Sequence, residues 1–508
     1  MFQNIKSSLL PIPKKIQKNG KTYIFPKKLS IHTSSCHDIR YKHACNSIRT
    51  TISGTGLEIS IETQGHETNE YILTIGTSNL SKRDNIKSGG YQIDISDDLI
   101  CIVSNDISGF ISRTKTLTQI IRTCLIDKTR IPGLHIEDYP DYPWRGFMID
   151  AARAPSPIEY IKHIIEICSE AKLNFLIFRE GDDELSAVRY KNLPLGHENP
   201  FSFNFGQIQN LIHHAFLHGI EFIPEIESFG HSAAKRIHYP QLIKGGGKLE
   251  YPPLGYHMRK MHMDPDNTQS LNLLQKMFEE WMQVTTAPFI HLGCDEVKLP
   301  LSIQETYLRK VLSVFDKASV NAVKVFKPIV WSDAPLIDSS ANLTRCLWCY
   351  EEHHDLHGPP SFENSFLKHQ NINQYYEVDR HTVFMAGGSG SGHTPYSRGS
   401  FPDVIDNLIH WSKLGSHKSN WQGILAVQWS GNMLNQWLGD FFAVAELGWN
   451  AANASTSTGT ICQQIQSYLN SVAAVDPHQF SGYQEMWDGI ALKDGQFHRD
   501  YVITPEQC

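Results

Sequence analysis

The sequence predicts an α/β protein in which a small α+β domain precedes a (β/α)8 TIM barrel. From Trp144 onward, eight short apolar runs alternate with amphipathic segments. Before that point the chain shows short strand patterns separated by turn residues. The chain has 508 residues, of which 41% are hydrophobic and 19% charged, so it can bury the cores of more than one domain.

Residues 1–140 are predicted to form the α+β domain. Its strand patterns are KTYIFP, LEISIET, EYILTIG, GGYQIDIS and LICIVSN, and a helical pattern follows over 108–123. The proline-rich segment IPGLHIEDYPDYPWRG is predicted to be a junction, so the domain boundary is expected near residue 140.

Residues 141–508 are predicted to form the barrel and a C-terminal helical extension. Continuous apolar runs are typical of parallel strands that are buried on both faces. A doubly wound open sheet is the alternative, but no glycine-rich nucleotide loop follows the first run. Strands are expected at 146–150, 174–180, 221–227, 288–296, 328–333, 345–351, 382–387 and 424–430, and helices at 157–171, 205–218, 268–285, 302–318, 402–413 and 436–452.

Charge and cysteine content exclude several classes of protein. With 46 basic and 53 acidic residues the net charge is -7, which does not suit a nucleic-acid partner or an anionic membrane. No apolar run reaches the ~18 residues of a membrane span. The N-terminal segment has no secretory apolar core, so a cytoplasmic location is expected unless a signal was removed. Cys346 and Cys349 form a C-x-x-C without a second ligand pair, so neither a metal nor another cofactor is expected.

Acidic and aromatic residues gather at the expected carboxyl ends of the strands, where barrel enzymes place their chemistry. Asp295 and Glu296 end the fourth run, and two carboxyl groups at such short range would raise the pKa of one, which suits a general acid. From position alone, Asp295 could equally cap the next helix, with Glu296 solvated. Tryptophans at other strand ends offer flat apolar faces to a sugar ring, so a carbohydrate substrate is expected.

Five regions of the chain resemble, in the same order along the sequence, motifs of glycoside hydrolase family 20, the β-N-acetylhexosaminidases. HLGCDEV (291–297) resembles H-x-G-G-D-E, and WRGFMIDAAR (144–153) resembles R-G-x-x-x-D-x-x-R. FIPEIESFGH (222–231) resembles I-P-E-I-D-x-P-G-H, and AVQWSGN with FFAVAELGWN (441–450) resembles the end of that family's barrel. LLPIPKKI and residues 91–121 resemble its small N-terminal domain, so the resemblance covers nearly the whole chain.

The resemblance implies a retaining exo-β-N-acetylhexosaminidase that hydrolyses terminal β-linked N-acetylglucosamine or N-acetylgalactosamine. In such enzymes the 2-acetamido oxygen of the substrate attacks C1 and forms an oxazolinium ion. Glu296 would be the general acid and then the base, and Asp295 would hold the acetamido group. His231 would lie behind Glu296 with Asp182 as its partner, although the FREGDDEL segment leaves Asp183 as an alternative.

The resemblance also implies which residues bind the sugar. Arginine would bind ring hydroxyls through its planar donors, tryptophans would surround the acetamido group, and one tyrosine would bind it. No tyrosine matches clearly, and W-S-G-N replaces the family's W-x-E on strand 8, so an asparagine could contact the outer hydroxyls. The expected residues are Arg153, Trp331, Trp348, Trp429, Tyr350, Tyr376, Tyr396 and Asn432, with Asn435 as the alternative to Asn432.

Several departures from the family pattern indicate a divergent member. Cys294 stands where the family has glycine, and Glu227 and Phe229 replace Asp and Pro. The H-x-H-x-x-D-D pattern of strand 2 appears as FREGDDEL. Arg179 is among the residues that end the second run, and Glu225 and Glu227 end the third. Because Cys294 directly precedes the acidic pair, an adduct of an accessible thiol with a maleimide is expected to block the pocket.

Two other functions stay open. A catalytically inert sugar-binding barrel is less favoured, because a binder has no need of the acid at Glu296. A metal-dependent hydrolase using His231, Asp182 and Glu227 would lack a compact ligand motif such as H-E-x-x-H. The expected partner is an N-acetylhexosamine-containing glycan or glycoconjugate, and the sequence does not predict an oligomeric state.

Overall fold

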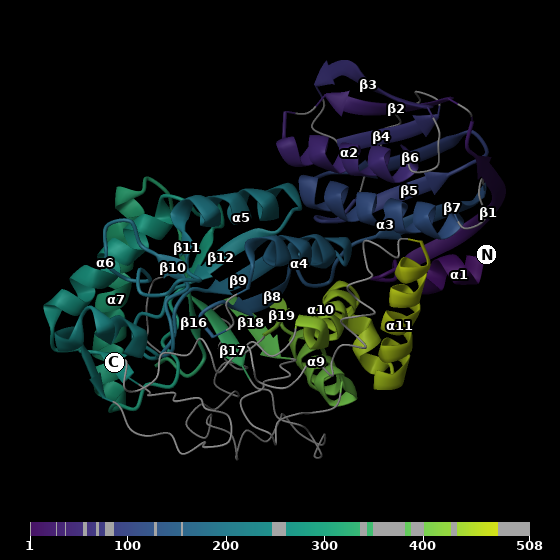
Figure 1. Cartoon of the computed structure of the whole chain (residues 1–508). Coiled ribbons are helices and arrows are strands. Elements are labelled where there is room, and N and C mark those ends of the chain that lie inside the picture. Colours follow the sequence, from purple (N-terminus) through teal and green to yellow (C-terminus); the bar gives the residue numbers. More distant parts are fainter. Residues whose placement is uncertain are drawn as a thin grey trace.

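Figure 1 shows the computed structural model, in which an N-terminal sheet with helices lies beside a ring of strands surrounded by helices. The architecture confirms the predicted (β/α)8 barrel preceded by a small α+β domain. The described residues are 2–26, 28–35, 37–53, 58–67, 71–76, 86–125, 130–153, 156–245, 261–335, 343–348, 382–387, 401–427 and 434–475.

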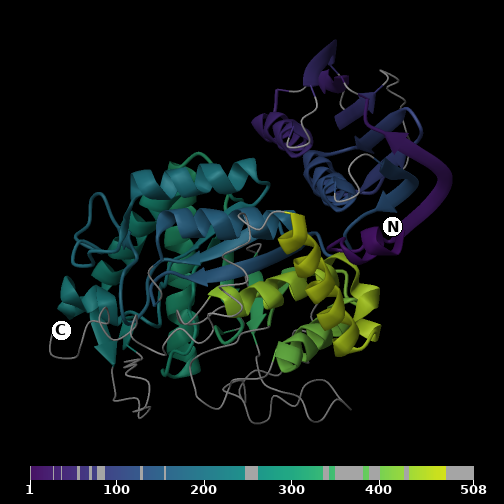
Figure 2. The same cartoon turned by 45° about the vertical axis from the view of Figure 1, so that its right-hand side comes forward.

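The N-terminal part is a seven-stranded sheet of order β1-β7-β5-β6-β4-β2-β3, antiparallel except between β2 and β3. In β5 every second residue is buried, so one face of the sheet carries the apolar side chains that pack on helices. Helices α2 and α3 cover the face turned toward the barrel (Figures 1 and 2). The elements are α1 (Phe2–Ser7), β1 (Lys15–Ile24), β2 (Lys28–Ser35), α2 (Ile39–Ser53), β3 (Glu58–Glu67), β4 (Tyr71–Gly76), β5 (Tyr91–Ile95), β6 (Leu99–Ser104), α3 (Ile107–Leu125) and β7 (Arg130–Asp138).

The first half of the predicted junction is a strand. In β7 the side chains of Ile131, Leu134 and Ile136 are fully buried, so the proline-rich segment contributes to the core of the sheet. Pro132 lies where β7 pairs with β1 and before its pairing with β5, so its missing N–H interrupts at most one ladder. The connection to the barrel spans only residues 139–143.

The barrel is closed by parallel pairing of each strand with the next, and the last strand pairs with the first. Helices cover its outside (Figure 1). The strands are β8 (Trp144–Asp150), β9 (Phe175–Arg179), β12 (Glu221–Glu225), β15 (Phe289–His291), β16 (Lys327–Trp331), β17 (Thr344–Trp348), β18 (Thr382–Gly387) and β19 (Trp421–Ala426). The helices are α4 (Ile158–Glu170), α5 (Phe205–Leu217), α6 (Thr268–Met282), α7 (Leu301–Asn321), α9 (Phe401–Gly415), α10 (Leu434–Trp449) and α11 (Thr458–Val475). Within the described residues, none of the helices is both long and apolar enough to cross a membrane.

Large rings fill the barrel interior near the amino ends of the strands. Phe175 and Phe384 lie 5.4 Å apart between ring centroids, and the ring of Trp144 packs against both. Gly146 and Gly423 make room for them, since a Cβ at either position would lie 2.4 Å from a phenyl carbon. Because this end is filled, the polar residues occupy the opposite, carboxyl end.

Candidate active site

The chain turns sharply after β15, and this turn presents Asp295 and Glu296. The φ angles of Gly293, Cys294 and Glu296 are +64°, +73° and +53°, in the left-handed region that favours glycine. A side chain at Gly293 is excluded, because its Cβ would lie 2.2 Å from Oε2 of Glu227. The alternation of a regular strand is lost here, so both carboxylates face the same histidine.

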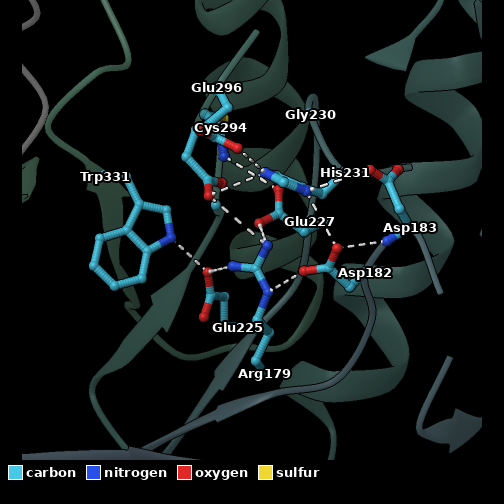
Figure 3. A network of polar contacts seen from close by, with 12 residues as sticks. Arg179, Asp182, Asp183, Glu225, Glu227, Gly230, His231, Cys294, Glu296 and Trp331 are labelled. Atoms are coloured by element: carbon cyan, nitrogen blue, oxygen red, sulfur yellow. Dashed lines mark hydrogen bonds and ion pairs between the residues drawn. The ribbon is translucent and has the colours of Figure 1, made fainter. Parts of the chain in front are cut away.

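That histidine is His231, which lies among four carboxylates (Figure 3). Its Nε2 atom is 3.2 Å from Oε2 of Glu296 and 3.5 Å from Oδ2 of Asp295. Its Nδ1 atom is 3.2 Å from Oδ1 of Asp182 and 3.5 Å from Oδ2 of Asp183. Burial alone would lower the pKa of His231, but the charges of Asp182 and Asp295 outweigh it and raise that pKa well above its ordinary value. A buried cation therefore lies behind the Asp295–Glu296 pair.

Arg179, at the end of β9, joins the carboxylates beneath this histidine (Figure 3). Its guanidinium is fully buried and binds acidic side chains from three strand ends. Its partners are Asp182 at 2.7 Å, Glu225 at 2.6 Å, Glu227 at 2.7 Å and Asp295 at 3.8 Å. Sequence reasoning marked Arg179 and these glutamates only as strand-end residues, and side-chain geometry reveals that they form one ion-pair network.

Several buried carboxyl groups of the site have raised pKa values. Burial, opposed by Arg179 and reinforced by Asp295, raises the pKa of Glu225 to about 7. Burial and the charge of Asp295 raise the pKa of Asp333 to about 7 and that of Glu227 well above its ordinary value. An excess of carboxyl groups over cations favours a bound species that acquires positive charge.

One oxygen of Asp295 is an unpaired acceptor. Its Oδ2 atom faces His231 and Arg179. Its Oδ1 atom is buried and has no hydrogen-bond partner among the described residues. Because a buried carboxylate oxygen without a donor is costly, we expect this atom to accept a hydrogen bond from a bound ligand.

Asp333 fixes the backbone of Glu296 and was not among the predicted site residues. Its Oδ2 atom accepts a hydrogen bond from the backbone N–H of Glu296, and its Oδ1 atom accepts one from the indole N–H of Trp348 at 3.1 Å. One carboxylate thus ties the turn after β15 to the end of β17. Its position two residues beyond β16 was the only sequence signal for this role.

Arg153 is enclosed by acidic side chains. Its guanidinium is 3.0 Å from Asp150, 2.8 Å from Asp182 and 3.3 Å from Glu184, and only 1% of its side chain is exposed. Burial raises the pKa of Asp182, but surrounding positive charges, first that of Arg153, hold it well below its usual range. The observed partners of Arg153 belong to the ion-pair network around His231. Contact of Arg153 with the ring hydroxyls of a sugar stays a prediction.

The predicted tryptophans that the structure describes are held by hydrogen bonds. Trp331 is fully buried, its indole N–H donates to Oε1 of Glu225 at 2.6 Å, and its ring lies 4.6 Å from that of His291. Trp348 donates to Asp333 and is partly exposed. Other predicted binding residues lie outside the described residues, namely Tyr350, Tyr376, Tyr396, Trp429 and Asn432. Asn435 lies in the first turn of α10.

The expectation that Cys294 is accessible to a maleimide is wrong. The residue is 2% exposed, and its Sγ atom lies 3.3 Å from Oγ of Ser228 and 3.5 Å from the carbonyl oxygen of Leu292. Burial raises the pKa of the Cys294 thiol far above its usual range, so the thiol is neutral as well as enclosed.

The residues of the metal-hydrolase alternative are already occupied by cationic side chains. Asp182 contacts Arg153 and Arg179, and Glu227 contacts Arg179 as well. A metal ion at this place would face two guanidinium groups at close range, which disfavours it. The chemistry of the cluster fits proton transfer rather than metal binding.

Two family profiles match the chain. Residues 6–139 match glycosyl hydrolase family 20, domain 2, and residues 142–326 match glycosyl hydrolase family 20, catalytic domain. Among curated relatives, β-hexosaminidase subunit A1 of Dictyostelium discoideum is 26% identical over 268 residues, 52% of this chain and 47% of that protein. The β-N-acetylhexosaminidase of Cellulomonas fimi is 26% identical over 218 residues, 41% of this chain and 44% of that protein. The chain thus spans about half the length of the curated relatives it matches.

Solved structures of the family share the fold. The family 20 exo-β-N-acetylglucosaminidase of Vibrio harveyi in complex with N-acetylglucosamine has a TM-score of 0.69 at 16% identity, over 94% of this chain and 78% of that one. The profile matches cover both the small domain and the part of the barrel that carries His231, Asp295 and Glu296. The chain therefore belongs to glycosyl hydrolase family 20.

Proposed function

We propose that the chain is a retaining exo-β-N-acetylhexosaminidase that removes terminal β-linked N-acetylglucosamine or N-acetylgalactosamine. The observation that carries this proposal is the buried, unpaired Oδ1 of Asp295 next to Glu296, whose carboxylate contacts the His231 cation. Substrate-assisted hydrolysis needs such a pair, with one carboxylate to hold the acetamido N–H and one to transfer a proton. The names of the curated relatives support the same substrate class.

In the first step, Oδ1 of Asp295 accepts a hydrogen bond from the acetamido N–H of the substrate. The acetamido carbonyl oxygen then attacks C1, the bond from C1 to the leaving oxygen breaks, and Glu296 gives its proton to that oxygen. An oxazolinium ion forms, and its positive charge is stabilised by Asp295 and the acidic network. In the second step Glu296 takes a proton from water, which attacks C1 and restores the acetamido group with net retention.

His231 and Asp333 are positioning residues in this mechanism. His231 contacts the side chain of Glu296 through Nε2, while Asp182 and Asp183 hold its other nitrogen. Asp333 accepts a hydrogen bond from the backbone N–H of Glu296. Because the backbone and the carboxyl group of Glu296 are both held, the proton donor has a fixed position before the substrate binds.

The first test compares aryl β-N-acetylglucosaminides and β-N-acetylgalactosaminides with aryl β-glucosides. We expect cleavage of the acetamido sugars only, because the plain glucoside brings no nucleophile. Comparable rates on the glucoside would contradict the mechanism. Binding of N-acetylhexosamine without turnover would instead support the inert sugar-binding barrel.

The second test separates the roles of the two carboxylates. Glu296→Gln removes the proton donor, so we expect kcat/KM to fall by about 10²–10⁴-fold for poor leaving groups and much less for activated aryl groups. Asp295→Asn weakens stabilisation of the oxazolinium ion, so its loss should be similar for all leaving groups. The measurement is kcat/KM across aryl glycosides of graded leaving-group pKa, and reversed slopes would reverse the assignment.

A further inference from the structure

A second cluster of titratable side chains lies at the opposite end of the barrel from the active site. Glu166 lies on α4, and His214 and His218 lie at the end of α5, which leads into the amino end of β12. The active site occupies the carboxyl ends of the strands, so the two sites are separate. We call Glu166, His214 and His218 the junction cluster, because α2 of the N-terminal domain brings His43 onto it, with ring centroids 4.7 Å apart between His43 and His218.

The donor atoms of the junction cluster have the spacing of metal ligands. One donor atom from each of the three residues lies within 4.8 Å of the other two. Oε1 of Glu166 is 3.2 Å from Nε2 of His214, and two ligands of one tetrahedral zinc ion lie about 3.3–3.5 Å apart. His214 and His218 are four residues apart, which places both on one side of the helix.

Two imidazole nitrogens of the junction cluster make no hydrogen bond that a metal ion would have to replace. Nε2 of His214 and Nδ1 of His218 are buried and have no hydrogen-bond partner among the described residues. The ion-pair contact between Oε1 of Glu166 and Nε2 of His214 holds these two ligand atoms side by side, so a metal ion could bind both with little rearrangement.

The local charges permit a cation at this place. The Lys115 ammonium is paired with Glu170 at 3.6 Å, and Glu166 supplies a negative charge to the cluster.

We propose that Glu166, His214 and His218 bind a divalent transition-metal ion of the zinc class, with solvent as the fourth ligand and His43 covering the site. Two imidazoles and one carboxylate suit zinc, cobalt or nickel, whereas calcium and magnesium require oxygen ligands. Beside the cluster, the guanidinium of Arg40 on α2 stacks over the ring of Phe216 at 4.5 Å. The ion would therefore strengthen the contact on which the N-terminal domain rests.

The test is calorimetric titration of the full chain with Zn²⁺ after removal of metals by a chelator. His214→Ala removes one ligand, so we expect the affinity to fall by about tenfold or more. His213→Ala is the matched control, because His213 is its exposed neighbour on α5, and its affinity should stay within about twofold of the wild type. Glu166→Gln keeps the side-chain shape and should weaken binding as His214→Ala does.

Two further measurements use the same proteins. Co²⁺ bound to the wild type and to His213→Ala should give the visible absorption of a tetrahedral site, which His214→Ala and Glu166→Gln should lose. Zn²⁺ should raise the midpoint of thermal unfolding only in the proteins that bind it. Equal Zn²⁺ affinity in His214→Ala and His213→Ala, or equal binding of Mg²⁺, would overturn the assignment. Because no readout is turnover, these results are independent of the proposed hydrolase activity.

Discussion

The neighbouring aspartates beside His231 allow a matched pair of substitutions, Asp182→Asn and Asp183→Asn. Each replaces a carboxylate by a neutral side chain of the same shape. Asp183 accepts the backbone N–H of Ala233 at 2.9 Å and lies 3.5 Å from His231. Asp182 contacts three cations, namely Arg179 at 2.7 Å, Arg153 at 2.8 Å and His231 at 3.2 Å.

The expected losses of stability differ for this reason. Removing one partner of a buried ion pair costs about 3–5 kcal/mol, and the other carboxylates around Arg153 and Arg179 keep the loss near the lower limit. We therefore expect Asp182→Asn to lower the free energy of unfolding by about 3 kcal/mol. In Asp183→Asn the amide oxygen still accepts the N–H of Ala233, so the loss should be about 1 kcal/mol or less.

The difference in free energy of unfolding between the wild type and Asp182→Asn also depends on pH. The raised pKa of His231 means that the protonated ring stabilises the fold fully below about pH 6.5, and this contribution is lost as pH rises through the raised pKa. The lowered pKa of Asp182 means that its contribution is present above about pH 4 and is lost as pH falls through the lowered pKa. The difference should therefore be largest between about pH 4 and 6.5 and should decrease in alkaline solution.

Denaturant unfolding followed by tryptophan fluorescence, at several pH values, measures these differences. Assays on an aryl β-N-acetylglucosaminide should show that Asp182→Asn loses more activity than Asp183→Asn, because His231 loses its main anchor. Equal destabilisation by the two substitutions, or a difference that does not change with pH, would refute this account of the network.

Three other substitutions follow from the turn after β15. Gly293→Ala should prevent formation of the active fold, because its Cβ would lie 2.2 Å from Glu227, and soluble yield and kcat report this. Cys294 should react with a thiol reagent only when denaturant is added, and labelling of the native enzyme would contradict its burial. Asp333→Asn should lower kcat by about 10–100-fold with little change in KM, because an amide cannot accept both N–H groups and the backbone of Glu296 loses its anchor. Wild-type kcat in this variant would show that the anchor is dispensable.

The barrel strands were predictable because each is a continuous apolar run bounded by polar residues, and all eight runs became strands. In the N-terminal domain the pattern of apolar residues was less regular. Helix α2 buries Tyr41, Ala44, Ile48 and Ile52 at helical spacing, but polar residues interrupt the pattern and hide it. Pro132 suggested a junction, since the sequence does not reveal that β7 pairs on one side only at that point.

Strand-end position predicted which residues approach the pocket but not how they pair. Asp182 and Asp183, the two candidate partners of His231, both lie beside it. Their spacing in the sequence could not predict this, because the chain bends after β9. The role of Asp333 depends on the direction of one backbone N–H at Glu296, which only the left-handed turn defines. The junction cluster could not be predicted either, since its residues meet only when α2, α4 and α5 pack together.

Two departures from the family pattern are linked through one contact. Arg179 lies in FREGDDEL, which departs from the family's H-x-H-x-x-D-D pattern, and Glu227 replaces a family aspartate. The two side chains meet at 2.7 Å in the network beneath His231. The longer carboxylate reaches the guanidinium, and the added cation offsets part of the acidic charge around Asp295. Arg179→His or Glu227→Asp alone should therefore lower kcat/KM by a larger factor than the same substitution made in the presence of the other. A double-mutant cycle on kcat/KM should give a coupling of about 1–3 kcal/mol, and simple additivity would show that the two side chains are not energetically coupled.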